Sequence, residues 1–151
     1  MSGIERLDAE TSRARDRFCE RFHASGLRQI FNYLPEVYFV AKDLEGRVML
    51  ANQVAARMCG FACESDLIGK TDSDIFTEER ASEYIQDDRH VFETGGRIVD
   101  KVEMAPDPNN SINWMVVTKI PLFDRDGAMI GLACVARNTT ETHAVLRPYA
   151  K

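Results

Sequence analysis

The chain has 151 residues, of which 44% are hydrophobic and 28% are charged, a balance typical of one soluble globular domain. The net charge is -5 and the arginines near the N-terminus are interleaved with acidic residues, which argues against nucleic-acid binding by this segment. No apolar stretch approaches the roughly 20 residues that span a bilayer, and the polar start lacks the apolar core of a signal peptide. We therefore expect a cytoplasmic protein without a membrane partner.

Residues 4–24 predict an amphipathic helix. Apolar side chains recur at spacings of three, four or their sum in a highly charged background, at Ile4, Leu7, Ala14, Phe18 and Phe22. The stripe is narrow, and its near-heptad spacing suits a second helix. We expect a homodimer formed through Ile4, Leu7, Phe18 and Phe22, and the alternative is a helix that folds back over the open face of its own sheet.

The next segments predict a short helix, a hairpin and a capped helix. Residues 27–34 are helical in pattern and stop at Pro35. Residues 37–40 and 47–50 are rich in strand formers and flank a turn, which indicates a β-hairpin. Asn52 can then cap a helix that runs to Met58 and ends at Gly60.

A helical block and three further strands complete the pattern. Residues 65–69 and 72–76 predict single turns, and residues 77–94 predict the longest helix, which starts at Thr77 and stops at Gly95. Residues 97–104, 112–123 and 129–137 predict an antiparallel meander. Strands on both sides of a helical block indicate an α+β fold with one five-stranded antiparallel sheet and helices on one face.

Several short motifs occur in a characteristic order between residues 27 and 141. They are residues 34–47, Ala51-Asn52, residues 67–72, residues 93–95, Trp114 with residues 119–127, residues 130–132 and residues 136–141. In this order the chain resembles the PAS family, in particular the bacterial sensory subgroup of signalling proteins and transcriptional regulators.

The resemblance implies a sheet with the first two strands at its centre and a cavity between the long helix and the sheet. It also implies that the signal leaves through the last strand and the residues after it, which here are Arg137, Asn138, Thr139 and Thr140. We accordingly expect an N-terminal dimerisation or capping helix over 1–26, a PAS sensory domain over 27–141, and the start of a linker helix to a possible output domain over 142–151.

The expected function is sensing of a small molecule or partner, with relay to transcription regulation or phosphorelay. Ten side chains are candidates for lining the ligand cavity, with an ordinary filled core as the alternative: Tyr38, Val40, Met58, Tyr84, Phe92, Met104, Trp114, Val116, Met129 and Cys134.

Other chemistries lack the residues that they need. His90 lies on the long helix, but the position where relatives that bind haem place their ligand falls nearer Tyr84. Residues 70–74 contain no cysteine for a photoactive flavin. Cys59 and Cys63 lack the second ligand pair of a structural zinc site, so we expect reduced thiols and no metal.

No motif for catalysis is present, and we expect neither an enzyme nor a bound cofactor. The alternatives to a small-molecule sensor are a haem- or flavin-based redox or gas sensor and a ligand-free PAS dimerisation module.

Overall fold

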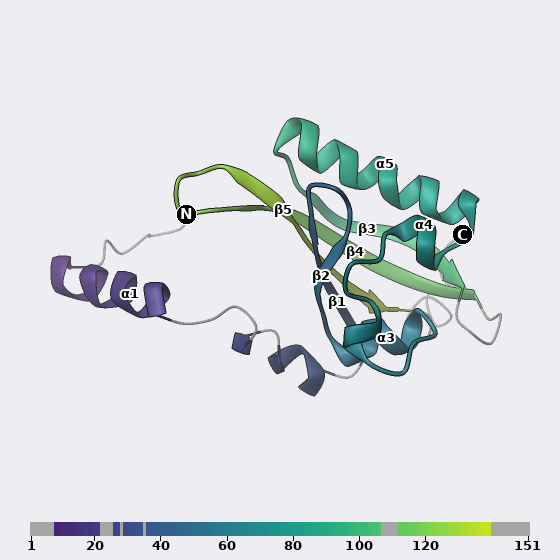
Figure 1. Cartoon of the computed structure of the whole chain (residues 1–151), viewed down its shortest axis with the longest axis horizontal. Helices are drawn as coiled ribbons and strands as arrows, with labels where there is room; N and C mark the ends of the chain where they lie inside the picture. Colours follow the sequence, from purple (N-terminus) through teal and green to yellow (C-terminus); the bar gives the residue numbers. More distant parts are fainter. Residues whose placement is uncertain (1–7, 22–25, 28, 35, 107–111, 140–151) are drawn as a thin grey trace, which may run out of the picture.

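A five-stranded antiparallel sheet forms the body of the protein, in a computed structural model that describes residues 8–21, 26–27, 29–34, 36–106 and 112–139 (Figure 1). The strands are β1 (Val37–Asp43), β2 (Val48–Ala51), β3 (Ile98–Pro106), β4 (Ile112–Phe123) and β5 (Met129–Asn138). The helical elements are α1 (Ala9–Arg21), η1 (Gln29–Tyr33), α3 (Gln53–Met58), η2 (Glu64–Asp66), α4 (Asp72–Ile75) and α5 (Glu78–Thr94).

The predicted α+β fold and its meander are confirmed, with the strand order β2-β1-β5-β4-β3. The expectation that the first two strands lie at the centre is wrong for β2, which is an edge strand. β5 takes the middle position because it pairs with β1 on one side and with β4 on the other.

The long helix α5 begins and ends at the residues that the sequence predicts. Thr77 caps its N-terminus, where the side chain accepts a hydrogen bond from the backbone of Arg80 at 3.4 Å. Gly95 closes its C-terminus in the left-handed conformation at φ 65°, and its N–H donates to Val91 O at 2.9 Å. That conformation suits glycine because it lacks a Cβ.

Asn52 connects the start of α3 to β1, the strand next to the middle of the sheet. Its side-chain oxygen accepts from the N–H of Ala55 at 3.0 Å, which is the predicted cap, and also from the N–H of Phe39 at 3.1 Å. Its side-chain nitrogen donates to Val37 O at 2.7 Å. Asn52 is fully buried, and these bonds satisfy both ends of its amide.

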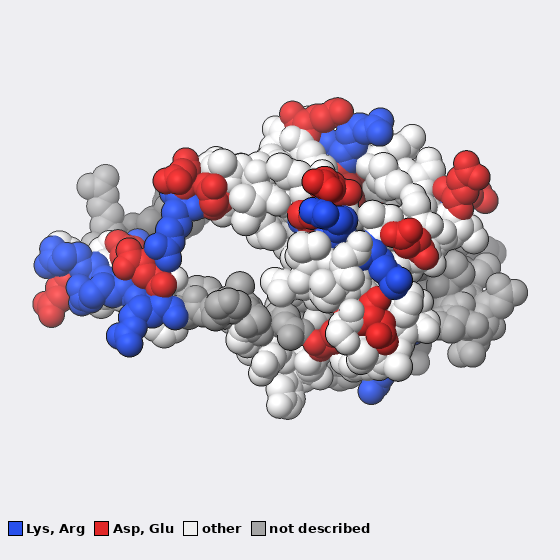
Figure 2. Space-filling model, in the orientation of Figure 1, with Lys and Arg blue, Asp and Glu red and all other residues white. Residues whose placement is uncertain are grey.

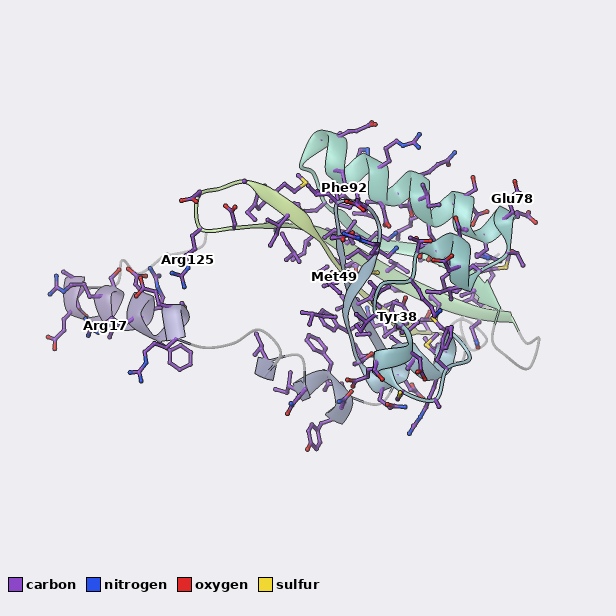
Figure 3. The ribbon with its side chains drawn as sticks, in the orientation of Figure 1. Arg17, Tyr38, Met49, Glu78, Phe92 and Arg125 are labelled. Atoms are coloured by element: carbon purple, nitrogen blue, oxygen red, sulfur yellow. The ribbon has the colours of Figure 1, made fainter. Side chains whose placement is uncertain are left out.

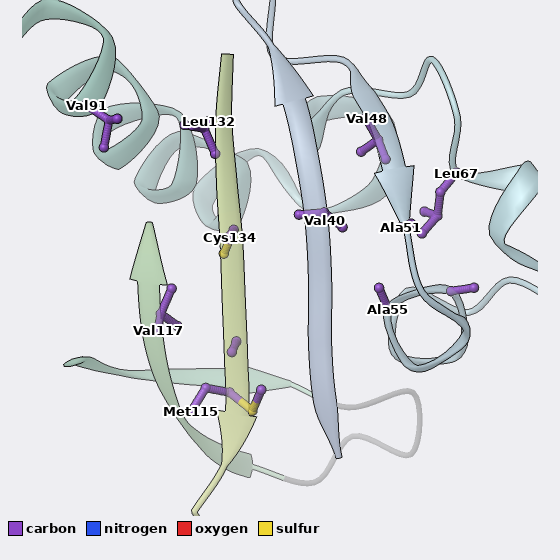
Figure 4. Close-up of a cluster of buried hydrophobic side chains, with 12 residues drawn as sticks. Val40, Val48, Ala51, Ala55, Leu67, Val91, Met115, Val117, Leu132 and Cys134 are labelled. Atoms are coloured by element: carbon purple, nitrogen blue, oxygen red, sulfur yellow. The ribbon is translucent and has the colours of Figure 1, made fainter. Parts of the chain in front are cut away.

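The hydrophobic core lies between the sheet and the helices α3, α4 and α5, which cover the same face (Figure 4). Val40, Leu132 and Val117 contribute from three neighbouring strands, and Val91 contributes from α5. On the opposite face of β1, Phe39 stacks on Phe31 of η1 with ring centroids 4.4 Å apart. The covered face therefore carries the main core and can hold an interior site.

The N-terminal helix α1 lies apart from the sheet (Figure 1). Basic and acidic side chains are interspersed along it (Figure 2), and it buries none of its residues. Phe18 is 69% exposed. Arg125, at the β4–β5 turn, donates to Glu20 O at 3.4 Å and lies beside α1 (Figure 3). Ile4, Leu7 and Phe22 of the predicted dimer stripe lie outside the described residues.

No helix in the described part of the chain is both long enough and apolar enough to cross a membrane.

Candidate functional site

A cavity of about 70 Å³ lies between the helices and the covered face of the sheet. Its walls come from strands, helices and the loops between them. The lining residues are Tyr38, Val40, Lys42, Met58, Cys59, Asp72, Phe76, Tyr84, Glu103, Ala105, Met115, Val117, Lys119, Cys134 and Ala136.

Strand alternation determines which side chains reach this cavity. Tyr38, Val40 and Lys42 of β1 are two residues apart, so they share one face of the sheet. Cys134 of β5 pairs with Val40 and also with Lys119 of β4, which brings all three strands to the same face. The cavity wall is thus continuous across the middle of the sheet.

Five of the ten predicted cavity residues line this cavity: Tyr38, Val40, Met58, Tyr84 and Cys134. Figure 3 places Tyr38 within the body of the domain. The thiol of Cys59, which the sequence analysis did not select, is beside the Tyr38 hydroxyl.

The structure does not place the other five around the cavity. Met104 and Trp114 pair with each other across β3 and β4, and Val116 is two residues further along β4. All three follow the alternation to the other face of the sheet, because their neighbours Glu103, Met115 and Val117 line the cavity.

Phe92, in the last turn of α5, and Met129, the first residue of β5, both lie near the C-terminus of α5. Phe92 packs against the core cluster without reaching the cavity. A Cβ built on Gly95 would lie 3.9 Å from the terminal methyl carbon of Met129.

A buried chain of four charges forms the polar end of the cavity. Lys42 Nζ lies 2.6 Å from Asp72 Oδ2 and 2.7 Å from Asp88 Oδ2, and Lys119 Nζ lies 2.6 Å from Asp88 Oδ1. Each of these side chains is only 5–6% exposed. Lys119 Nζ also lies 5.8 Å from the ring centroid of Tyr84. The chain connects β1, β4, α4 and α5.

Sequence reasoning missed this ionic chain. A signal was available, since Lys42 continues the inward alternation of Tyr38 and Val40, and Lys119 continues that of Met115 and Val117. A lysine at an inward strand position needs a buried acid.

The charged groups at this end shift one another's pKa. Burial alone would lower the pKa of Lys42, but the carboxylates of Asp88 and Asp72 outweigh it and raise that pKa. Burial raises the pKa of Asp72, and the Lys42 ammonium opposes this only in part. Burial also raises the pKa of Glu103, despite the cations near it.

The two cavity thiols are protonated at neutral pH. Burial raises the pKa of Cys59 to about 11 and that of Cys134 to about 12. Because the thiolate is the nucleophile and metal ligand, these side chains act as small apolar groups.

The residues predicted to carry the signal out of the domain directly follow the part of β5 that lines the cavity. Asn138 donates from Nδ2 to Asn113 Oδ1 at 3.0 Å, and the N–H of Thr139 donates to Trp114 O at 2.7 Å. Arg137 pairs with Val116. Thr140 lies outside the described residues.

In the described part of the chain, the residues considered for haem or metal binding are not grouped into such a site. His90 is exposed on α5. Among the described residues, no group of three histidine, cysteine, aspartate or glutamate side chains is placed to hold a metal ion.

Comparison with known proteins agrees with the fold. The family described as PAS fold matches residues 31–144. The chain belongs to the PAS family.

Two solved structures of VqmA are similar to this PAS domain. VqmA bound to DPO is 32% identical with a TM-score of 0.65, and the match covers 72% of this chain and 55% of that one. A Vibrio cholera VqmA–ligand–DNA complex is 27% identical with a TM-score of 0.68, and covers 87% of this chain and 60% of that one.

A curated relative is a diguanylate cyclase of Vibrio cholerae serotype O1 (strain ATCC 39541 / Classical Ogawa 395 / O395). It is 29% identical over 106 residues, which are 70% of this chain and 33% of the cyclase. The PAS domain therefore spans about a third of that relative and little more than half of VqmA. Its family is sensory, and its solved relatives include ligand-bound receptors.

Proposed function

We propose that this PAS domain senses a small molecule in the cavity beside α5 and relays binding through the end of β5 to an output such as transcription regulation or phosphorelay. The observation that carries this proposal is the cavity, which combines an apolar wall with a few convergent polar groups. The similarity to VqmA bound to DPO supports a small-molecule ligand.

The relay proposal rests on the course of β5. Cys134 and Ala136 line the cavity, and Arg137, Asn138 and Thr139 follow at once. A ligand that displaces this part of β5 changes the hydrogen bonds of Asn138 and Thr139 to β4. A coupling free energy of about 1–3 kcal/mol is sufficient for such a switch.

We also propose a homodimer formed through the N-terminal helix, with residues 27–141 as the sensory unit. The exposure of Phe18 and the separation of α1 from the sheet support a helix partner. The proposed linker over 142–151 lies outside the described residues.

A thermal-shift experiment with matched variants tests the ligand proposal. The unmodified protein, Ala136→Leu and Ala133→Leu are screened with DPO and a panel of small metabolites. Ala136→Leu places a larger side chain in the cavity. Ala133 is the neighbour of the cavity residue Cys134 on β5, so its side chain points to the other face of the sheet.

At least one compound should raise the melting temperature of the unmodified protein and of Ala133→Leu but not that of Ala136→Leu. At 100 times its Kd a ligand adds about 2.7 kcal/mol of stability. If no compound stabilises the unmodified protein, the ligand-free dimerisation module replaces the proposal. A stoichiometric haem or flavin absorption band in the purified protein would replace it with a cofactor-based sensor.

A further inference from the structure

The ammonium groups in the cavity are already neutralised by the protein. Lys42 is shared between Asp72 and Asp88, and Lys119 is bound to Asp88, all within 2.7 Å. An anionic ligand would have to break one of these nearly dry ion pairs to reach a lysine. Breaking such a pair leaves a buried charge without compensation and is strongly unfavourable. The lysines therefore do not make the cavity an anion site.

The cations at the rim are also paired with acids. Lys101 Nζ lies 2.5 Å from Asp87 Oδ2, and Arg80 Nη1 lies 3.5 Å from Glu83 Oε2. Lys42, Lys119, Lys101 and Arg80, the described cations around the cavity, therefore each have an acid other than Glu103 within 3.5 Å.

Glu103 is the cavity acid with the weakest ion pairing among the described residues. It lines the cavity from β3, and its side chain is 15% exposed. Its nearest charged partner among the described residues is Lys101 at 3.8 Å, which is longer than a hydrogen bond. No hydrogen bond from any described residue reaches its carboxylate. The cavity is thus lined by one partly exposed carboxylate that forms no hydrogen bond to the described residues.

The wall next to Glu103 is largely apolar. Ala105 is two residues from Glu103 on the same strand face, and Met115, Val117 and Ala136 continue the surface across β4 and β5. A ligand that fits this wall has a small apolar body, and a ligand that satisfies Glu103 has an N–H donor, most strongly a cationic one.

We propose that the cavity selects small primary amines over neutral and anionic compounds of the same shape, with Glu103 receiving the ammonium group. This inference rests on the proposed ligand-sensing function. It assigns the chemical class of the ligand and the residue that recognises it.

The charged groups facing Glu103 set the pH behaviour of this site. Burial raises the pKa of Glu103, and the largest opposing influences are the cations Lys101 and Lys119, with Asp87 adding to the rise and Arg80 opposing it. Lowering the pH through this raised pKa protonates the carboxylate and removes the charge that holds the ammonium group.

The test is a titration of the full chain, followed by amide NMR, with isobutylamine, isobutanol and isobutyrate. These probes share one branched body of four carbon atoms and differ in the polar group. Isobutylamine should bind at least 10-fold more tightly than isobutanol, and isobutyrate should bind more weakly than either. The amide shifts should centre on β3 and the cavity wall.

Glu103→Gln should reduce the preference for isobutylamine over isobutanol to less than about 2-fold, since a neutral amide loses the charge-assisted bond. Glu79→Gln, at an exposed position in the first turn of α5, removes the same charge and should leave the preference unchanged. In the unmodified chain, acidification should weaken the binding of isobutylamine and leave that of isobutanol unaffected, and Glu103→Gln should lack this pH dependence.

The outcomes separate the two proposals. Equal or tighter binding of isobutanol or isobutyrate overturns amine selection and leaves ligand sensing intact. An equal loss in Glu79→Gln also overturns it, because the preference would then reflect net charge. If none of the three probes binds, amine selection is wrong, and the metabolite screen decides separately whether the cavity senses any ligand.

Discussion

Lys42 of β1 donates a hydrogen bond from Nζ to Asp88 Oδ2 of α5 at 2.7 Å, across 46 positions of sequence. Both side chains are almost dry, at 5% and 6% exposure. The pair connects a strand next to the centre of the sheet to the helix that covers it. Any movement of α5 relative to β1 must therefore stretch a buried ion pair.

Asp88→Asn should destabilise the protein strongly. The substitution keeps the shape of the side chain but leaves Lys42 and Lys119 with less negative charge to neutralise them. Removing one partner of a buried pair costs about 3–5 kcal/mol. The midpoint of urea unfolding measures the loss. Glu93→Gln, exposed on the same helix, should stay within about 0.5 kcal/mol, and an equal midpoint for the two variants would contradict a buried pair.

Gly131→Ala should prevent close pairing of β5 with β1. A Cβ at this position would lie 1.9 Å from Lys42 O and 3.0 Å from Lys42 C. These are backbone atoms of the paired strand, so no side-chain rotation relieves the contact. Circular dichroism melting should show a large loss of stability or no cooperative transition.

Gly26→Ala is the matched control for Gly131→Ala, because a Cβ there meets nothing within 4 Å. It should melt like the unmodified protein. If Gly131→Ala melts like this control, the strands are further apart in solution than in the structure.

Glu103→Gln should raise stability at neutral pH, and the gain should disappear on acidification. Burial raises the folded-state pKa of Glu103 above the usual 4.5. Below pH 4.5 the Glu103 carboxyl is protonated in both the folded and the unfolded protein, so it does not change the free energy of unfolding. As pH rises through the folded-state pKa, the folded protein holds an ionised carboxylate that is better solvated when unfolded, so the unmodified protein loses stability.

Melting temperatures of Glu103→Gln and Glu79→Gln between pH 4 and pH 8 measure this difference. A gain that is independent of pH, or that grows towards acid, would contradict the assigned direction.

Phe18→Glu should convert a dimer into a folded monomer. Phe18 is 69% exposed on α1, and a buried charge at a helix interface opposes association. Light scattering of the full chain at tens of micromolar gives the mass before and after substitution. Unmodified protein that is already monomeric would refute the proposed dimer, and an unchanged dimer would place the interface away from this position.

The helices and strands of this fold could be predicted from the sequence because interactions between residues close in sequence define where they begin and end. Thr77 and Gly95 satisfy the ends of α5 through their own neighbours, and Asn52 caps α3 through Ala55 three residues later. These interactions depend on a few consecutive residues, so the printed sequence contains them in full. The order of the PAS motifs then made the whole fold recognisable.

The cavity needed the tertiary structure, because strand register decides which face a side chain takes. Trp114 and Met115 are adjacent and both apolar, yet Met115 lines the cavity and Trp114 points to the other side. A shift of one residue would exchange them. Composition and hydrophobicity contain no information about that choice.

The ionic end of the cavity is still further from sequence reasoning. Asp72 and Asp88 reach Lys42 from 30 and 46 positions away, and Lys119 joins them from β4. The strand alternation marks Lys42 and Lys119 as inward-facing, but it does not say which acids meet them. Only the packing of α4 and α5 on β1 and β4 brings them together in a dry interior, beside the cavity that Glu103 lines from β3.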